Sequence, residues 1–342
     1  MKEARPARHR KRHSSSLQEV SRALSRHKSF LLAAHVRPEG DSVGSLLALK
    51  ELLRRLKKKC WIVNEDPFPE RLGLLPRNGW HTAREIARRK NKPVFDAAIV
   101  VDCPRPGRMG AVEALIHPDT VLINIDHHVS NSFFGTHNLV RANASACGEL
   151  VYELFEKMRV PLSKQAALPL YVSVSTDTGS FRNSNTSSRT HEIAARLIRT
   201  GINVEKINEA LYERASRPRV RLLADLLSRM HLTMGGSIAW GALPKSLLRR
   251  SGASQEDTEG LIDYLRFVQN VKIAFLITEM APREWNCSLR AKGSCDVSRI
   301  AESLGGGGHR KAAGCTLRGE ASHVAKRLLA VIRSTLNGAS IL

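Results

Sequence analysis

The apolar runs DAAIVVD at residues 96–102 and VLINID at residues 121–126 decide the fold class of this chain. Each run has the length of a buried strand and ends in an aspartate. FLLAAH at residues 30–35 and CWIV at residues 60–63 are further runs of this kind, and apolar residues at helical spacing follow at residues 42–59. Short apolar strands that alternate with helices predict an α/β fold, with a parallel sheet and helices on both faces.

The rest of the chain predicts a second, smaller α/β domain. A hairpin with a Gly-Gly turn is expected at residues 231–243, strands at residues 270–280 and 285–293, and a helix at residues 321–336. Helices are expected between residues 147 and 201, interrupted by the polar loop at residues 175–187. We therefore expect four segments: a basic flexible arm (1–15), an N-terminal parallel-sheet domain (16–200), a helical linker (201–230) and a C-terminal domain (231–342).

Composition excludes several classes of protein. Of the 342 residues, 42% are hydrophobic and 25% are charged, as in globular proteins. No apolar run is long enough for a transmembrane helix, and the N-terminus lacks the apolar core of a secretory signal. The six cysteines form no C-x-x-C pair, which favours reduced thiols and a cytoplasmic location.

The charge balance points to polyanionic partners. The chain carries 54 Lys and Arg against 32 Asp and Glu, a net charge of +22, of which residues 1–13 supply +5. We expect the basic arm to be solvated, with nonspecific nucleic-acid contact as the sharper alternative. Aromatic residues make up only 5% of the chain, which argues against a stacking platform for long single strands and favours short phosphorylated ligands.

Potential metal ligands occur in four separate groups along the chain. Three of the groups begin where an apolar run ends, and in parallel sheets the carboxyl ends of the strands carry the chemistry. Carboxylates gathered there would repel one another unless cations neutralised them, and mixed His and carboxylate ligands favour Mn²⁺ or Mg²⁺ over structural zinc. The groups are His35 with Glu39 and Asp41; Asp102; Asp126 with His127 and His128; and Asp177.

Five motifs, in this order, resemble those of the DHH phosphoesterase superfamily. They are HVRPEGDSVGS, VVDCP, IDHHVSN, STDTGSFRNSNTS and the C-terminal SLRAKGSCDVSRIAESLGGGGHRKAAG, which resembles the DHH-associated domain. Together they resemble the nano-RNase (oligoribonuclease) and 3′-phosphoadenosine 5′-phosphate phosphatase group. The resemblance covers residues 16–338 and leaves only the basic arm outside.

The resemblance implies a two-metal site. One metal would be held by His35, Glu39 and Asp102, and the other by Asp41, Asp102, His127 and Asp177. Asp102, Asp126 and His128 would be the catalytic residues, with Asp126 orienting its neighbours and His128 facing the substrate phosphate. Glu39 departs from the family pattern, in which Asp is usual, and this puts the affinity or preference of the first metal in doubt.

A glycine run at residues 305–308 is the candidate substrate-binding segment. Consecutive glycines let backbone N–H groups approach an anion, and basic residues follow. Within the DHH-associated pattern, the run resembles a loop that holds the far end of a nucleotide. The implied substrate-binding residues are Arg290, Gly306, Gly307, Gly308, His309 and Arg310.

The implied function is that of a two-metal phosphohydrolase. We expect it to degrade very short RNA oligonucleotides to mononucleotides and to dephosphorylate 3′,5′-bisphosphate nucleotides. A metal pair would activate water for in-line attack on phosphorus. Mn²⁺ is the expected metal, with Mg²⁺ or Co²⁺ as alternatives, and a homodimer is consistent with the resemblance. A linear or cyclic dinucleotide phosphodiesterase is the nearest alternative function. A catalytically silent, basic nucleic-acid-binding protein is the alternative from another class.

Overall fold

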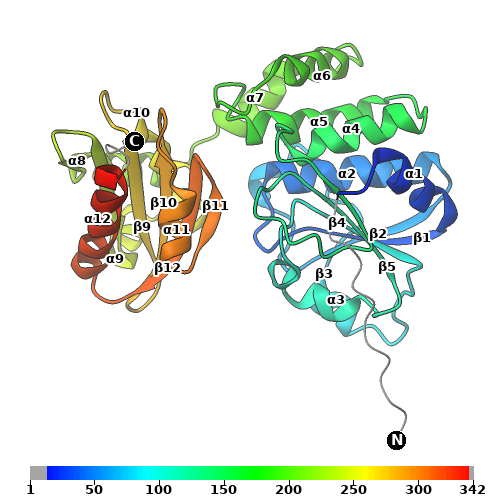
Figure 1. Ribbon diagram of the computed structural model, residues 1–342, viewed down its shortest axis with the longest axis horizontal. Helices are drawn as coiled ribbons and strands as arrows, with labels where there is room; N and C mark the ends of the chain where they lie inside the picture. The colour runs from blue at the N-terminus through cyan, green and yellow to red at the C-terminus, as the bar shows by residue number, and fades with distance from the viewer. Residues whose placement is uncertain (1–13, 339–342) are drawn as a thin grey trace, which may run out of the picture. The chain divides into compact units, whose positions relative to one another are not determined.

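The structure is a computed structural model that describes residues 14–338 (Figure 1). The chain forms two compact units, Met1–Glu213 and Arg214–Leu342. Most of the basic arm expected at residues 1–15 lies outside the described residues. Within residues 14–338, no helix combines the length and the apolar character needed to cross a membrane.

A six-stranded, fully parallel sheet organises the N-terminal unit. The sheet confirms the fold class, and the four predicted strands form its centre. The two remaining strands were not predicted, because each is only three or four residues long and contains polar side chains. The strands are β1 (Ser29–Ala33), β2 (Lys59–Asn64), β3 (Trp80–Thr82), β4 (Ala97–Val101), β5 (Val121–Asp126) and β6 (His137–Val140).

The order of the strands creates a natural ligand position. The order is β3-β2-β1-β4-β5-β6, so the connections after β1 and β4 leave in opposite directions. The carboxyl ends of β1 and β4 therefore lie side by side at a topological switch point, where open α/β sheets bind ligands.

Helices cover both faces of this sheet, as the alternation of strands and helices predicts (Figure 1). On one face, apolar side chains of α1, α2, α4 and α5 form the large core. On the other face, α3 and the 3-10 segment η2 cover a smaller core. The helical elements of this unit are α1 (Leu17–Arg26), α2 (Gly40–Arg55), η1 (Glu70–Leu72), α3 (Ala83–Ala87), η2 (Pro106–Leu115), α4 (Cys147–Lys157), α5 (Lys164–Asp177), α6 (Ser188–Ile198) and α7 (Val204–Tyr212).

Local signals explain where some of these elements begin and end. Ser16 and Glu19 form a capping box that starts α1, as the serine cluster predicts. α2 ends at Arg55, so Lys59, expected in the helix, instead begins β2. α5 continues to Asp177, so the predicted polar loop starts later than expected.

The C-terminal unit is built on a second six-stranded sheet, of order β11-β12-β10-β9-β8-β7. Only β8 and β9 pair in parallel. α11 and α12 pack on one face, and α8, α9 and α10 on the other. The elements are α8 (Arg217–Ser228), β7 (His231–Thr233), β8 (Ile238–Leu243), α9 (Lys245–Ser251), η3 (Glu256–Thr258), α10 (Leu261–Phe267), β9 (Ile273–Ala281), β10 (Glu284–Ala291), α11 (Ser298–Ser303), β11 (Gly307–His309), β12 (Ala312–Arg318) and α12 (Ala321–Gly338).

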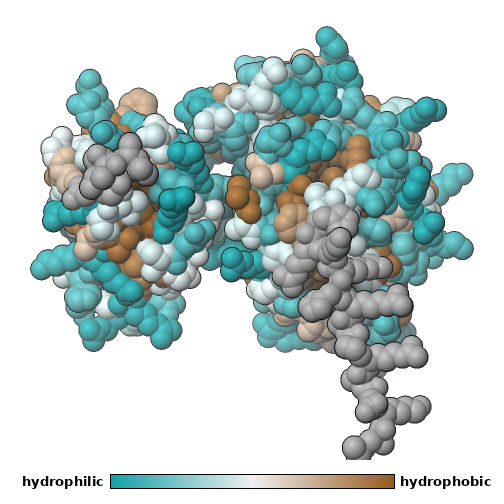
Figure 2. All heavy atoms as spheres, viewed as in Figure 1, coloured by the Kyte–Doolittle hydropathy of each residue, from teal (hydrophilic) through white to brown (hydrophobic). Residues whose placement is uncertain are grey.

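The predicted hairpin and the C-terminal helix are confirmed in this unit. β7 and β8 pair antiparallel, and Gly235 and Gly236 in their turn have positive φ angles of 62° and 82°. The continuous helical connector expected to about Met230 is instead two helices, α7 and α8, because the chain leaves the helical conformation at residues 213–216. Hydrophilic side chains cover most of the surface that is visible in Figure 2.

Candidate metal centre

The predicted metal ligands of the N-terminal unit gather at the carboxyl edge of the parallel sheet. His35 follows β1, Asp102 directly follows β4, and Asp126 ends β5. Because these three strands are neighbours in the sheet, side chains that are far apart in the sequence converge at the switch point.

Asp102 lies at the middle of this cluster and has an uncommon backbone conformation. Its φ is +51°, and its N–H donates to the carbonyl oxygen of Ile125 on β5 at 2.9 Å. The left-handed conformation is uncommon outside glycine, and Asp is among the residues that adopt it more readily. The turn directs a buried carboxylate toward the neighbouring strand ends.

Three imidazoles surround the Asp102 carboxylate. Its oxygens lie 3.4 Å from Nε2 of His35, 3.7 Å from Nε2 of His127 and 3.6 Å from Nδ1 of His128. Ser42 also donates to it at 2.6 Å. Burial by itself would raise the pKa of Asp102, but hydrogen bonds from His127 and His35 and the positive charges of His35 and His128 hold it well below its usual range. This carboxylate is therefore ionised.

Asp41 and Asp177 approach the other side of His127. Nε2 of His127 lies 3.7 Å from Asp41 and 3.8 Å from Asp177. The ligand atoms of these three residues all lie within 4.8 Å of one another. Asp41 comes from the first turn of α2 and Asp177 from the last residue of α5, so two helices and a strand end supply one cluster.

Hydrogen bonds hold the Asp41 carboxylate in place. It accepts from the backbone N–H groups of Cys147 and Gly148, at the start of α4, at 2.7 and 3.1 Å. Ser173 donates to it at 2.5 Å and Ser45 at 3.2 Å. The N-terminus of a helix favours an anion, so α4 orients this carboxylate.

Close helix packing makes this arrangement possible. A Cβ on Gly44 would lie 2.8 Å from Cβ of Ser173, and one on Gly148 would meet its hydroxyl. Larger residues at either position would push α5 away and remove Ser173 from Asp41. These two glycines therefore contribute to the site without touching a ligand.

The cluster carries more buried negative charge than its surroundings favour. Burial and the charge of Asp102 raise the pKa of Asp41, and burial raises the pKa of Asp177 to about 7. Burial would lower the pKa of His127, but a hydrogen bond to Asp102 and the charges of Asp177 and Asp41 raise it well above its usual range. Positive charge is thus favoured where these side chains meet, as expected of a cation site.

Asp126 holds the two histidines that follow it. It is fully buried and accepts from the backbone N–H of His127 and from Nδ1 of His128, both at 2.8 Å. Asn131 donates to its other oxygen at 2.5 Å and also to Asn124 at 2.8 Å. Asp126 therefore fixes the ring of His128 and the backbone of the predicted ligand His127, and such support by an outer carboxylate is common around protein metals.

His35 and Glu39 have different surroundings. Nδ1 of His35 bonds to the carbonyl oxygen of Val36 at 2.7 Å, and its Nε2 points to Ser42 and Asp102. Glu39 is exposed at the N-cap position of α2 and makes no capping hydrogen bond. The structure therefore brings His35 and Asp102 together and leaves the Glu39 side chain at the surface.

The donor set fits two divalent cations. Carboxylate and imidazole donors suit Mn²⁺, Mg²⁺ and related ions, and no thiol is needed. Burial raises the pKa of Cys103 to about 12 and that of Cys147 well above its usual range, so the neighbouring cysteines stay protonated. Among the described residues of the N-terminal unit, two groups of potential ligands meet the spacing that an ion requires: Asp41, His127 and Asp177; and Asp102, Asp126 and His128.

Several residues of the site escaped the sequence analysis. Ser42, Ser173 and Asn185 bond to the predicted carboxylates; Ser42 and Asn185 lie inside the quoted motifs HVRPEGDSVGS and STDTGSFRNSNTS, whereas Ser173 lies outside every quoted motif. Asn131 lies inside the quoted IDHHVSN motif, so its place five residues after Asp126 was a usable signal.

The predicted substrate-binding residues lie in the C-terminal unit. The glycine run is less of a loop than expected, because Gly307–His309 form the edge strand β11, paired with β12. Gly306 and Gly308 are needed for this pairing, since a Cβ on either would lie 2.6 Å from atoms of β12. Arg310 is exposed and donates to the carbonyl oxygen of Ser294 at 2.9 Å.

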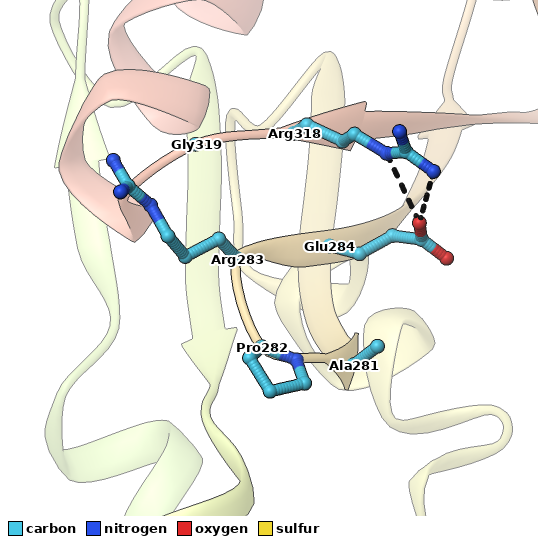
Figure 3. Close-up of a pocket in the computed structure, with 6 residues that line it drawn as sticks. All are labelled: Ala281, Pro282, Arg283, Glu284, Arg318 and Gly319. Atoms are coloured by element: carbon cyan, nitrogen blue, oxygen red, sulfur yellow. Dashed lines mark hydrogen bonds and ion pairs between the residues drawn. The ribbon is translucent and has the colours of Figure 1, made fainter.

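Arg290 lies on β10, on the face of the sheet that carries α10. Its guanidinium is 4.0 Å from Asp263, and its side chain is 31% exposed. Figure 3 shows a separate pocket at the turn between β9 and β10, with an ion pair between Arg318 and Glu284 at 3.0 Å. No predicted substrate-binding residue lines that pocket.

Comparisons with known proteins agree with this architecture. The 29%-identical "Bifunctional oligoribonuclease and PAP phosphatase NrnA" of Thermus thermophilus matches over 91% of this chain and 91% of its own length. The protein of the same name from Bacillus subtilis is 25% identical over 87% of this chain and 92% of its own. The crystal structure of an exopolyphosphatase-related protein from Bacteroides fragilis shares the fold, with a TM-score of 0.84, 23% identity and coverage of 93% of this chain and 95% of that one.

Two family models match consecutive parts of the chain. Residues 29–174 match the DHH family, N-terminal domain, and residues 241–338 match the DHHA1 domain. The first match contains the strand ends and all of the predicted metal ligands except Asp177. The chain therefore carries a DHH domain followed by a DHHA1 domain.

Proposed function

We propose that this protein is a two-metal-dependent phosphohydrolase that degrades very short oligoribonucleotides to mononucleotides and removes phosphate from 3′,5′-bisphosphate nucleotides. The observation that carries the proposal is the convergence of Asp41, Asp102 and Asp177 around His127 at the switch point of the sheet. The names of the relatives from Thermus thermophilus and Bacillus subtilis support the two substrate classes.

The metal ligands follow from the clusters. Asp41, Asp102, His127 and Asp177 would hold one cation, and His35 and Asp102 would hold the other, with Asp102 between them. We propose Mn²⁺ as the metal, with Mg²⁺ or Co²⁺ as alternatives, and we assign Glu39 no more than an outer role in view of its exposure. When bound, two such cations stabilise negative charge that develops on a phosphoryl group and make a water molecule more acidic.

The remaining side chains orient the reacting groups. Asp126 holds the His128 ring through Nδ1, so that His128 would contact the phosphate in a fixed orientation. The backbone amides of α4 and the Ser173 hydroxyl hold Asp41, which limits the movement of the carboxylate. No side chain is needed as a covalent nucleophile.

The C-terminal unit would bind an anionic group of the substrate. We propose that Arg290 and Arg310 supply positive charge, and that backbone N–H groups of Gly306, Gly307 and Gly308 approach an anionic group, with His309 beside them. The position of β11 at the edge of the sheet supports this role, because one side of an edge strand has backbone groups that no strand pairs. The segments 16–200, 201–230 and 231–342 are proposed as catalytic domain, linker and substrate-binding domain.

A cytoplasmic location and a homodimer are part of the same proposal. All six cysteines are free thiols, as is usual for proteins of a reducing compartment.

The test is hydrolysis of short substrates by the purified full chain with Mn²⁺. We expect 5′-labelled di- to pentanucleotides to become mononucleotides, and Asp102→Asn to abolish turnover because it removes the charge at the centre of the cluster. Asp119→Asn is the matched control, since Asp119 is exposed and precedes β5, at the opposite end of that strand from His127. Turnover of a cyclic dinucleotide, without turnover of trinucleotides or the bisphosphate nucleotide, would favour the dinucleotide phosphodiesterase. Tight RNA binding without turnover under any divalent metal would refute the proposal in favour of a silent binding protein.

A further inference from the structure

We propose that a hollow lined by four lysines, at the amino-terminal edge of the parallel sheet, binds the sugar–phosphate backbone of RNA outside the metal centre. The choice of RNA as the ligand rests on the proposed function. The lysine hollow is lined by Lys28, Ser29, Leu56, Lys57, Lys58, Lys59 and Asp96.

The lysine hollow and the metal centre lie at opposite edges of one sheet. Lys28 precedes β1, Lys59 begins β2, and Asp96 precedes β4, whereas the metal ligands follow the other ends of the strands. β1 has five residues, which at about 3.3 Å each span about 16 Å. A group bound in the lysine hollow is therefore not the group that undergoes hydrolysis.

The four lysines of the lysine hollow outnumber its single carboxylate. Within residues 14–338, no ion pair joins a carboxylate to Lys28, Lys57, Lys58 or Lys59. The single acidic residue of the lining, Asp96, accepts from the backbone N–H groups of Lys28 and Ser29 at 2.9 and 3.1 Å. These bonds lower its pKa and direct the carboxylate to the backbone rather than to the ammonium groups.

Lys57 adopts a backbone conformation that glycine adopts more easily. Lys57 has a φ of +57°, in the left-handed region that favours glycine. It follows the end of α2, where Lys58 N–H bonds back to Leu53 at 2.8 Å. Glycine would suit this turn better.

Stabilisation of α2 explains only two of the four lysines of the lysine hollow. Cations near the C-terminus of a helix are favourable, which explains Lys57 and Lys58. Lys28 instead lies just before β1, and Lys59 begins the neighbouring strand β2, where its N–H donates to the Lys28 carbonyl at 2.9 Å. Like charges that are brought together without counterions repel one another, and a polyanion would remove this repulsion.

The lining indicates how the ligand is recognised. It contains no aromatic ring, so base stacking is not available, and lysine ammonium groups act as point charges toward phosphates. Binding should therefore be independent of base sequence and strongly dependent on salt. The site would hold longer RNA on the enzyme while short fragments reach the metal centre.

The test compares two charge-reversal variants of the full chain with the same change in net charge. Lys57→Glu/Lys59→Glu alters the lysine hollow, and Arg199→Glu/Lys206→Glu alters exposed residues outside it. The probe is a fluorescein-labelled single-stranded RNA of about 20 nucleotides, titrated by anisotropy without divalent metal at about 50 mM salt. We expect the first variant to lose about tenfold in affinity and its salt slope to fall by about 1.4, and the control to lose less than about threefold.

Two further measurements keep the result interpretable. Lys57→Gly removes one charge while it suits the left-handed turn, so it should weaken RNA binding without loss of thermal stability. Dinucleotide turnover should be unchanged in the lysine-hollow variants. Equal losses of affinity in both charge-reversal variants, or no loss in either, would overturn the inference. If the parent protein fails to hydrolyse dinucleotides, the proposed function fails, while the RNA-binding comparison still decides this inference.

Discussion

Replacement of Asn131 by alanine tests whether the second layer of the site controls the reaction. Asn131 donates to Asp126 at 2.5 Å and to Asn124 at 2.8 Å, and it accepts from the N–H of Phe133 at 2.7 Å. Loss of three buried hydrogen bonds, at about 1 kcal/mol each, should lower the free energy of unfolding by about 3 kcal/mol. Because Asp126 orients both His127 and His128, turnover should also fall by about 10- to 100-fold.

Asn138→Ala is the matched control. Asn138 is another buried asparagine, and its side chain makes two hydrogen bonds with the backbone of Gly135, at 2.9 and 2.8 Å, away from the carboxylates. It should lose about 2 kcal/mol of stability and keep its kcat. Urea unfolding and turnover of a dinucleotide with saturating Mn²⁺ measure both effects. If Asn131→Ala loses stability but keeps the kcat of the parent, the second-layer argument is wrong.

Three further predictions concern stability. Gly306→Ala should lower the free energy of unfolding by about 1–3 kcal/mol, because its Cβ would lie 2.6 Å from Cβ of Cys315. Gly307→Ala should leave the stability unchanged, because nothing lies within 4 Å of its Cβ. A lower melting temperature for Gly306→Ala than for Gly307→Ala would confirm this prediction. Hydrogen bonds from Arg54 lower the pKa of Glu51 to about 2. Glu51→Gln should therefore lower the free energy of unfolding by about 1–2 kcal/mol at pH 7, a value kept small because solvent screens the exposed arginine partners. Ionised Glu51 stabilises the fold above its unfolded pKa near 4.5. The difference in urea midpoint between the parent protein and Glu51→Gln should therefore shrink as the pH falls from about 4.5 toward 2. A difference that stays constant over this pH range would contradict the assignment. Mn²⁺ at about 100 times its dissociation constant should raise the free energy of unfolding by about 2.7 kcal/mol, reversibly with EDTA, and an unchanged melting temperature would count against a metal centre.

The sequence predicted the centre of the parallel sheet well because its signals are local. Each central strand is a short apolar run, and the polar residue that ends it marks the carboxyl edge. Asp102 and Asp126 could therefore be placed near each other before the strand order was known. The edge strands β3 and β6 escaped because partly exposed strands of three or four residues carry no such run.

The sequence was less informative where function depends on packing between helices. Ser173 lies in an apolar helix, 132 residues from Asp41, and the two meet only because Gly44 and Gly148 allow α2, α4 and α5 to approach closely. The glycine run illustrates the same limit. A run of four glycines predicts a loop, yet pairing with β12 makes part of it an edge strand.

By itself, the sequence determined the α/β class and the chemical nature of the site, because strand periodicity and ligand types are properties of neighbouring residues. It also suggested that the ligands belong together, through the order of the motifs. Only the tertiary structure decided that Asp41, Asp102, His127 and Asp177 share one cluster while Glu39 stays at the surface. The physical reason is that distances between side chains depend on strand order and helix packing, which bring together residues that are remote along the chain.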